Sequence, residues 1–398
     1  MKKILFIHHA TGWTGAAINM INIINGLDRT KYITNVLLLR DSIVSKMLTE
    51  NNIQYTIAKS AFYKKYYSYF IHSDASNLKW FRLDIVLKQT LSWILSRFYY
   101  ASCELKRLEY DIVHLNSSVL TDWLAPSKGK GKVIIHIQEP FSKGNWGLRH
   151  YILTSQMRKY ADQIIAISKD NARRINVQEK TKVVYNFIKI NEEDDIDNRN
   201  SESGKVLYVG GSEMIKGYFT VVDSLDYLDH DIKLVFCGNY ATVDNKSGLF
   251  GIIKNIIRSI LPVHKKLKAA LIKIKNHPNA VFVGLVNNTT IMIQESEFLI
   301  SPFSKPHFSR PVFEAFANKR CVIGSDVEGM DEIIDHRMNG LIIEKNSPVK
   351  LAEAINYLHA NFEIRNEMAE NGYTKAKGLF SSSNILQIQN IYDDLFLS

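Results

Sequence analysis

Short apolar runs that end in a polar residue, glycine or proline recur along this chain, separated by stretches with the apolar spacing of helices. The first half supplies KILFIHH, NVLLLR, DIVHLNS, KVIIHIQE, QIIAIS and KVVYNF, and residues 16–27 after the first run have helical spacing. The second half supplies KVLYVGG, IKLVFCG, AVFVGLV and FLISPF. Strands that alternate with helices build parallel sheets, so the pattern predicts an α/β fold.

An acidic and polar stretch divides the chain. Residues 191–204, NEEDDIDNRNSESG, lack periodic apolar positions and have the composition of an exposed linker. A chain of 398 residues is too long for one ordinary core and suits two domains. We therefore predict α/β domains over 1–190 and 205–383, a linker over 191–204 and a C-terminal helix over 384–398.

Cysteine usage and hydropathy indicate the compartment. Cys103, Cys237 and Cys321 are far apart in apolar contexts, which predicts buried, reduced thiols in a cytosolic protein. The apolar run of the first strand is too short for a signal peptide. No stretch approaches the roughly 18 uninterrupted apolar residues of a membrane-spanning helix. We expect a cytoplasmic protein, soluble or peripheral at the inner face of the cell membrane.

Residues 303–344, FSKPHFSRPVFEAFANKRCVIGSDVEGMDEIIDHRMNGLIIE, predict a loop, helix, strand, helix and strand. Pro311 can open the helix because its missing N–H would be unpaired there, which puts Glu314 in the first turn. An anion at that place matches the helix dipole, so Glu314 also has a purely structural interpretation. Ser325 and Asp326 end the next strand. They mark the carboxyl-end edge of a parallel sheet, where ligands collect.

The same segment resembles the donor-sugar motif of glycosyltransferase family 4, retaining enzymes with the GT-B architecture of two Rossmann-like domains facing across a cleft. The family pattern is roughly Glu-Gly-Phe-Gly-x-Pro-x-x-Glu, an apolar strand, a Gly-x-x-Glu turn and Asn-Gly. The resemblance implies that the second domain binds a nucleotide sugar and that the C-terminal helix crosses back to the first. This chain supplies Phe308, Pro311, Glu314, the turn 328–332 and Asn339-Gly340.

Departures from the family pattern lie at its start. Pro306 stands where the family has its first Glu, His307 replaces the first Gly, and Ser309 replaces the second. In the family the first Glu lies near the sugar hydroxyls and the second binds the nucleotide ribose. The resemblance therefore implies a ribose contact for Glu314. It also makes further residues candidates for substrate binding: His307, Phe308, Ser309 and Arg310.

Two glycine-containing turns are candidates for phosphate binding. Residues 209–217, VGGSEMIKG, resemble the family's Gly-Arg-x-x-x-x-Lys-Gly signature, with Lys216 in the Lys place and Gly211 in the Arg place. A cation there stabilises the departing diphosphate, and Arg310 is our candidate for the missing second charge. Gly15, after the first strand, is predicted to let backbone amides approach a diphosphate. A solvated lysine and an ordinary turn are the alternatives. The resemblance also implies that the base of the nucleotide contacts backbone groups near Val286.

Polar residues end two strand-like runs of the first domain, 111–117 and 133–140. The resemblance places the family's His-Asp-like pair, which faces the anomeric carbon and the acceptor, on Gln138 and Glu139. His136 lies two residues earlier, and the strand period puts it on the side of Gln138, with Glu139 on the other. Our catalytic candidates are His136, Gln138, Glu139 and Lys216. A satisfied core histidine is the alternative for His136.

The sequence offers no cluster of metal ligands. Asp194 and Asp195 lie in the predicted linker, and the histidines lack ligand spacing on a common element. The resemblance implies that cations and helix amides replace a divalent metal. We therefore expect no cofactor, with a nucleoside-diphosphate sugar as co-substrate.

The net charge of +10 favours an anionic partner, and much of the positive charge lies in residues 246–275. No acidic residue lies between Asp244 and Glu295. Two apolar helical stripes with lysines opposite predict either helices packed on their own domain or an interfacial pair on an anionic membrane surface. The aromatic, basic run 62–70 and the stretch 85–98 predict a membrane-surface acceptor loop or the edge of an aromatic core.

The resemblance implies a retaining, metal-independent glycosyltransferase, and we expect it to move a hexose or related sugar to a glycan or lipid-linked glycan in cell-surface polysaccharide biosynthesis. A nucleotide-sugar epimerase or hydrolase of the same fold is one alternative. A non-catalytic sugar- or membrane-binding module is another, because the first Glu and the Arg of the family pattern are missing. Nucleic-acid binding is disfavoured, since the basic residues alternate with aliphatic stripes rather than stacking platforms.

Overall fold

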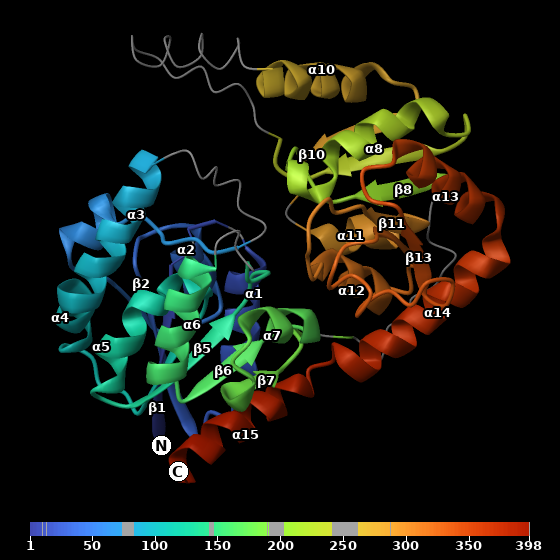
Figure 1. Cartoon of the computed structure of the whole chain (residues 1–398). Coiled ribbons are helices and arrows are strands. Elements are labelled where there is room, and N and C mark those ends of the chain that lie inside the picture. Colours follow the sequence, from blue (N-terminus) through green and yellow to red (C-terminus); the bar gives the residue numbers. More distant parts are fainter. Residues whose placement is uncertain are drawn as a thin grey trace. The chain divides into compact units, whose positions relative to one another are not determined.

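The computed structural model describes residues 1–9, 11–12, 14–73, 83–142, 147–188, 190, 203–240, 262–286 and 288–397 (Figure 1). The chain divides into two compact units. Unit 1 comprises Met1–Lys189 and Leu379–Ser398, and unit 2 comprises Ile190–Gly378. Apart from 203 and 204, the predicted linker lies outside the described residues.

Unit 1 is built on a seven-stranded parallel sheet with the order β3-β2-β1-β4-β5-β6-β7. Apolar side chains cover both of its faces, as a parallel sheet between helices requires. The three-residue strand β3 is too short for a sequence pattern to reveal. The strands are β1 Lys2–His8, β2 Tyr32–Leu38, β3 Tyr55–Ile57, β4 Ile112–Leu115, β5 Lys132–Ile137, β6 Gln163–Ala166 and β7 Thr181–Val183.

Helices cover the sheet of unit 1 because their apolar faces need burial. In α1 the Thr14 side chain caps the first turn by accepting from the Ala17 amide, and Met20 and Ile24 are buried. The helix α15 belongs to the same unit and packs Ile388 and Tyr392 into its core. The helices are α1 Gly15–Gly26, α2 Ile43–Glu50, α3 Leu83–Leu95, α4 Ala101–Leu105, α5 Leu124–Lys128, α6 Leu148–Tyr160, α7 Lys169–Ile175 and α15 Asn384–Leu397, with π-helical turns η1 Phe62–Tyr66 and η2 Ser96–Tyr100.

The aromatic run 62–70 lies mostly in the core of unit 1. Tyr63 and Tyr67 are buried, and the Tyr67 hydroxyl donates to Asp122 Oδ2 at 2.8 Å. Phe62 stacks on Tyr100 with ring centroids 4.1 Å apart. Most of the aromatic side chains of this run therefore form an aromatic core edge, while Lys64, Lys65 and Tyr66 are exposed.

Unit 2 contains a six-stranded parallel sheet with the order β10-β9-β8-β11-β12-β13. With the sheet of unit 1 it confirms the predicted α/β fold with parallel sheets. The strands are β8 Lys205–Tyr208, β9 Lys233–Cys237, β10 Ala280–Gly284, β11 Phe298–Ser301, β12 Val322–Ser325 and β13 Gly340–Ile343. The helices are α8 Tyr218–Ser224, α10 Pro262–Asn276, α11 Thr289–Gln294, α12 Arg310–Ala317, α13 Pro348–Ala360 and α14 Phe362–Leu379.

Three local predictions were wrong. The helix α12 begins at Arg310, so Glu314 is its fifth residue and lies beyond the first turn. The helix expected between β12 and β13 is a run of turns, because the Asn339 side chain accepts from the Asp335 amide at 2.9 Å and ends the single turn at 330–334. Cys237 and Cys321 are buried free thiols, whereas Cys103 is half-buried, because it lies at the edge of the core.

The described part of the basic segment 246–275 packs on its own unit. Residues 246–261 lie outside the described residues, and α10 buries Ala270 and Ile274. Lys273 Nζ pairs with Asp226, and Lys266 Nζ lies 4.4 Å from the ring centroid of Phe219. Among the described residues no helix is both long and apolar enough to cross a bilayer.

Candidate functional site

The order of the strands defines a switch point in each unit. In unit 2 the chain runs outward from β8 to β9 and β10, then returns to the other side of β8 with β11. In unit 1 the same change of direction lies between β1 and β4. Ligands of open parallel sheets bind outside the carboxyl ends of the strands at such points. The loops after β8 and β11, and those after β1 and β4, are therefore the candidate ligand-binding loops.

The loops after β8 and β11 contact each other closely. The Ser304 amide donates to the Ile215 carbonyl at 2.9 Å. Gly217 has a φ of 79°, and a Cβ there would lie 2.0 Å from the Pro302 carbonyl oxygen. A side chain at 217 would push the loops apart, so this glycine keeps the turn 209–217 against the loop after β11, residues 302–309, which we call the donor loop after the motif it contains.

Gly211 explains why the second cation of the family signature is missing here. Its φ is 56°, and a Cβ would lie 2.3 Å from the Asn239 carbonyl oxygen and 2.7 Å from the Asn239 nitrogen. The loop after β9 fills the space that an arginine stem would need. Position 211 therefore cannot carry the arginine of the family signature.

Lys216 lies at the end of a short 3₁₀ turn, Met214–Lys216, and its side chain is 30% exposed. Its Nζ is 2.9 Å from Glu213 Oε1. Burial lowers the pKa of His307 to about 3, and the positive charge of Lys216 adds to this effect. The structure thus brings together two predicted site residues, a lysine cation and a neutral imidazole.

The donor loop turns two of its predicted binding residues inward. Phe308 packs on Phe313, and the buried Ser309 hydroxyl lies 2.9 Å from the Ser301 hydroxyl. His307 stacks on Phe303 with ring centroids 4.1 Å apart, and its Nδ1 is buried without a partner in the described part of the chain. The Phe308 and Ser309 side chains are therefore packed, whereas the half-buried His307 ring keeps one nitrogen without a partner among the described residues.

Arg310 and Glu314 form an ion pair on α12. Arg310 Nε donates to Glu314 Oε1 at 2.6 Å, and the two side chains are 21% and 22% exposed. The bond occupies one nitrogen of the guanidinium and one oxygen of the carboxylate. The remaining nitrogens of Arg310 and Oε2 of Glu314 can still contact a ligand, and the pair holds both groups in place.

Val286 lies half-buried in the loop after β10, at the same edge of the sheet. The Gly238 amide donates to the Gly284 carbonyl at 2.8 Å, which joins the loops after β9 and β10. Backbone groups near Val286 are therefore fixed at the carboxyl edge of this sheet.

In unit 1, α1 starts at the exposed Gly15 beside the β1–β4 switch point. Thr14 Oγ1 accepts from the Ala17 amide at 3.3 Å, so the cap already uses one amide of the first turn. The amides of Gly15 and Ala16 belong to the same exposed turn. An anion near this end of the helix would meet them.

Gln138 belongs to a cluster of amide side chains at the carboxyl ends of β4 and β5. Its Nε2 donates to Asn116 Oδ1 at 3.1 Å, and its Oε1 accepts from Asn19 and Asn186 at 3.4 Å each. Asn116 also bonds His8 Nδ1 at 3.0 Å. Sequence reasoning missed Asn19 and Asn186, which lie in segments far from β5.

His136 lies deeper on the same face of the sheet. Its Nδ1 is 3.2 Å from His114 Nε2, and His114 Nδ1 is 2.8 Å from the Tyr392 hydroxyl. Burial lowers the pKa of His136 to about 3, so the ring is neutral. Its Nε2 is buried without a partner among the described residues. Because His136 is enclosed, its environment matches the core histidine named as the alternative.

Glu139 turns away from that cluster. It accepts from the Ser117 hydroxyl at 2.9 Å, from the Ser118 amide at 2.8 Å and from the Ser118 hydroxyl. Burial raises the pKa of Glu139, and the serine hydrogen bonds oppose that rise. The raised pKa means that this carboxyl group holds a proton more strongly than an exposed glutamate does.

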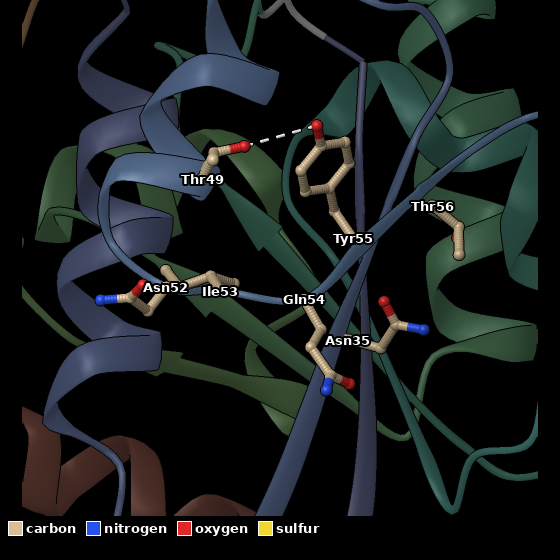
Figure 2. Close-up of a pocket in the computed structure, with 7 residues that line it drawn as sticks. All are labelled: Asn35, Thr49, Asn52, Ile53, Gln54, Tyr55 and Thr56. Atoms are coloured by element: carbon tan, nitrogen blue, oxygen red, sulfur yellow. Dashed lines mark hydrogen bonds between the residues drawn. The ribbon is translucent and has the colours of Figure 1, made fainter.

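A separate hollow of about 500 Å³ lies at the β3 edge of the unit 1 sheet (Figure 2). All of the residues that line it are uncharged: Asn35, Thr49, Asn52, Ile53, Gln54, Tyr55 and Thr56. It offers no cation for a diphosphate, and it lies away from the switch point. In the described residues no group of three or more His, Cys, Asp or Glu side chains could hold a metal.

Comparison with known proteins finds similarity to glycosyltransferases. Residues 189–375 match the model of the family described as glycosyl transferases group 1. An uncharacterized glycosyltransferase of Methanocaldococcus jannaschii is 26% identical over 244 residues, which are 60% of this chain and 62% of that relative. The match thus spans about three fifths of the length of that relative.

Solved structures show the fold. HepE of Anabaena, in complex with UDP, has a TM-score of 0.73 at 17% identity and covers 98% of this chain and 100% of its own. Sucrose-phosphate synthase of Thermosynechococcus elongatus has a TM-score of 0.68 at 15% identity, with both chains covered to 100%. At these identities the likeness concerns the fold alone, which is GT-B with two α/β domains.

Proposed function

We propose that this chain, whose residues 189–375 form a glycosyl transferases group 1 domain, is a retaining glycosyltransferase of the family 4 type. It transfers a sugar from a nucleoside-diphosphate donor to a glycan or lipid-linked glycan, in the biosynthesis of a cell-surface polysaccharide. The reaction needs no metal and takes place in the cytoplasm, at the inner face of the membrane.

One observation carries this proposal. At the switch point of unit 2 the turn 209–217 and the donor loop are held together, and they gather a lysine, a neutral histidine and the Arg310–Glu314 pair. A nucleoside-diphosphate sugar presents a dianionic diphosphate, a ribose with two hydroxyls and a neutral sugar. Lys216 and Arg310 offer cations to the diphosphate, and Glu314 offers a hydrogen-bond acceptor to the ribose hydroxyls.

Charge stabilisation is the role of Lys216 in this proposal. As the glycosidic bond breaks, the leaving diphosphate gains negative charge, and a fixed cation in a cleft stabilises it by about 3–4 kcal/mol. The Arg310 guanidinium supplies the second charge that Gly211 cannot carry. Glu314, oriented by Arg310, accepts from the ribose hydroxyls, which are ordinary partners of a carboxylate.

Unit 1 supplies the acceptor side of the reaction. Gly15 and the first turn of α1 present amides to the diphosphate. Glu139 exchanges a proton with the attacking hydroxyl, for which its raised pKa suits it. Gln138, held by Asn116, positions the acceptor.

UDP-glucose is the first donor to test, because HepE has been solved with UDP-glucose, and that structure has a TM-score of 0.72 against this chain. The chain is incubated with UDP-glucose and a mixture of short glycans and lipid-linked glycans, and the product anomer is assigned by NMR. We expect a product with the anomeric configuration of the donor. An inverted product would contradict the retaining mechanism.

The same assay separates the alternatives. Donor consumption in the absence of any acceptor, without transfer when acceptors are added, would favour an epimerase or hydrolase. Neither turnover nor donor binding would favour a non-catalytic module. The Lys216→Ala variant serves as the catalytic control, and Lys268→Ala, an exposed lysine of α10, is the matched control that keeps wild-type turnover.

A further inference from the structure

The helix α3 and the following π turn bury Trp93 and three polar side chains, and expose six apolar side chains. We call the exposed apolar set the α3 face: Leu83, Leu87, Leu91, Ile94, Leu95 and Phe98, of which Leu83, Leu87 and Phe98 are 70–73% exposed. Gln89, Ser92 and Ser96 are buried on the other side. A helix on the surface of a soluble domain normally has the opposite arrangement.

Hydrogen bonds hold the helix in this orientation. The Ser96 hydroxyl lies 2.7 Å from the Tyr63 hydroxyl, and Ser92 Oγ accepts from the Ser68 amide at 3.2 Å. Gln89 Oε1 accepts from Arg149 Nη2 at 3.2 Å. Rotating α3 to bury its leucines would break all three bonds and leave polar groups unpaired. The outward position of the α3 face is therefore built into the packing of unit 1.

A hollow of about 570 Å³ lies beside the α3 face, between α3 and the segment 60–66. Leu91 and Leu95 line it on one side, and Phe62 and Tyr66 line it on the other. It is apolar enough to take part of an acyl chain. Neighbouring α6, which Arg149 ties to α3, exposes Leu148 and Tyr151 as well.

The charges around the α3 face are mainly positive. Lys88 lines the hollow, and Lys64 and Lys65 are exposed on the same short helix as Tyr66. Asp84 is the exposed acidic residue of α3. Lysine stems can lie along apolar surface while their ammonium groups reach phosphates. An aliphatic surface with a cationic rim matches the boundary between acyl chains and anionic headgroups.

We propose that the α3 face docks unit 1 onto an anionic lipid bilayer, with Lys64, Lys65 and Lys88 on the headgroup phosphates. A second copy of the chain fits less well, because a two-fold interface would set the same lysines against each other. The proposal of docking depends only on the side chains of the α3 face and its lysines. Only its purpose, to bring the enzyme to a lipid-linked acceptor, rests on the proposed function.

Flotation with lipid vesicles tests this proposal on the full chain. The vesicles contain equal parts of phosphatidylcholine and phosphatidylglycerol, with pure phosphatidylcholine as the comparison. We expect wild type to float with the anionic vesicles and to be released by salt. The triple variant Leu87→Gln, Leu91→Gln, Phe98→Gln should bind at least about tenfold more weakly. The variant Lys64→Gln, Lys65→Gln, Lys88→Gln should lose the preference for anionic lipid.

The matched control removes three exposed apolar side chains elsewhere: Met338→Gln, Val349→Gln and Leu386→Gln. It should float like wild type. Circular dichroism checks the fold, and Leu87→Gln and Leu91→Gln as single changes replace the triple variant if it does not fold. Flotation of a folded α3-face variant equal to wild type would overturn the proposal. So would a wild type that ignores anionic vesicles, or a dimer in light scattering that the triple variant dissociates.

Donor binding is measured in parallel, so that the two proposals can fail separately. If wild type floats but no nucleotide sugar raises its melting temperature, the lipid surface stands and the proposed transfer does not. If UDP-glucose binds but no variant changes flotation, the reverse holds.

Discussion

At the residue scale, Lys216 and Glu314 are polar side chains that the core does not require, since both are partly exposed. We predict that Lys216→Ala and Glu314→Ala each lower the transfer rate by about 10²-fold or more, because each removes one group that contacts the donor. Initial rates with the true donor measure this, and melting temperatures near that of wild type show that the fold is intact. Wild-type turnover by either variant would refute the assignment of this site.

Asp122 gives a prediction for stability against pH. Burial raises the pKa of Asp122 to about 7, well above that of an unfolded aspartate. The folded state therefore holds a proton that the unfolded state releases, so stability falls as pH rises from about 4 to 7. Asp122→Asn should remove most of this fall, and the exposed Asp229→Asn should not. Thermal unfolding at pH 5 and pH 8 measures both. Equal slopes for wild type and Asp122→Asn would contradict the raised pKa.

The sequence predicted which residues belong to the candidate site better than it predicted which residues they hydrogen-bond. Lys216 and Glu314 were predicted from the family resemblance of two continuous segments, 209–217 and 303–344. The ion pair of Arg310 with Glu314 and the amide cluster around Gln138 were not, because the cluster joins α1, β4, β5 and the loop after β7. A single sequence carries no signal that Asn186 and Asn19 meet at one oxygen atom.

At the element scale, α15 ties the end of the chain to unit 1. The Tyr392 hydroxyl lies 2.8 Å from His114 Nδ1 in the core. Tyr392→Phe should lower the free energy of unfolding by about 1–3 kcal/mol, because a buried nitrogen loses its partner. The exposed Tyr227→Phe is the matched control and should change little. Urea unfolding measures the difference, and an unchanged midpoint for Tyr392→Phe would show that this bond adds nothing to stability.

Strands were predictable where a run of apolar residues fills both faces of a sheet, as in β1, β5 and β9. Two features of the fold could not be predicted from the sequence. The turn at 330–334 does not become a helix, since the side chain of Asn339 stops it. The leucines of α3 face outward because Ser92 and Ser96 have partners inside, and periodicity alone would have buried those leucines.

At the scale of the whole molecule, the proposed chemistry uses cations and backbone amides in place of a metal. We predict that transfer continues in the presence of EDTA at concentrations that strip divalent ions. Loss of activity with chelator and its recovery with Mg²⁺ or Mn²⁺ would show that a metal takes part. A Mg²⁺-dependent enzyme assayed in the same buffer confirms that the chelation is complete.

The central claim is that unit 2 binds a nucleoside-diphosphate sugar at its switch point, and a thermal-shift series with UDP, GDP, CDP and their sugars tests it most directly. A ligand at 100 times its Kd stabilises the folded state by about 2.7 kcal/mol. The account predicts that one nucleotide raises the melting temperature by about 5–10 °C, and that Lys216→Ala and Glu314→Ala each shrink this rise. No rise with any nucleotide, or an equal rise in both variants, would contradict it.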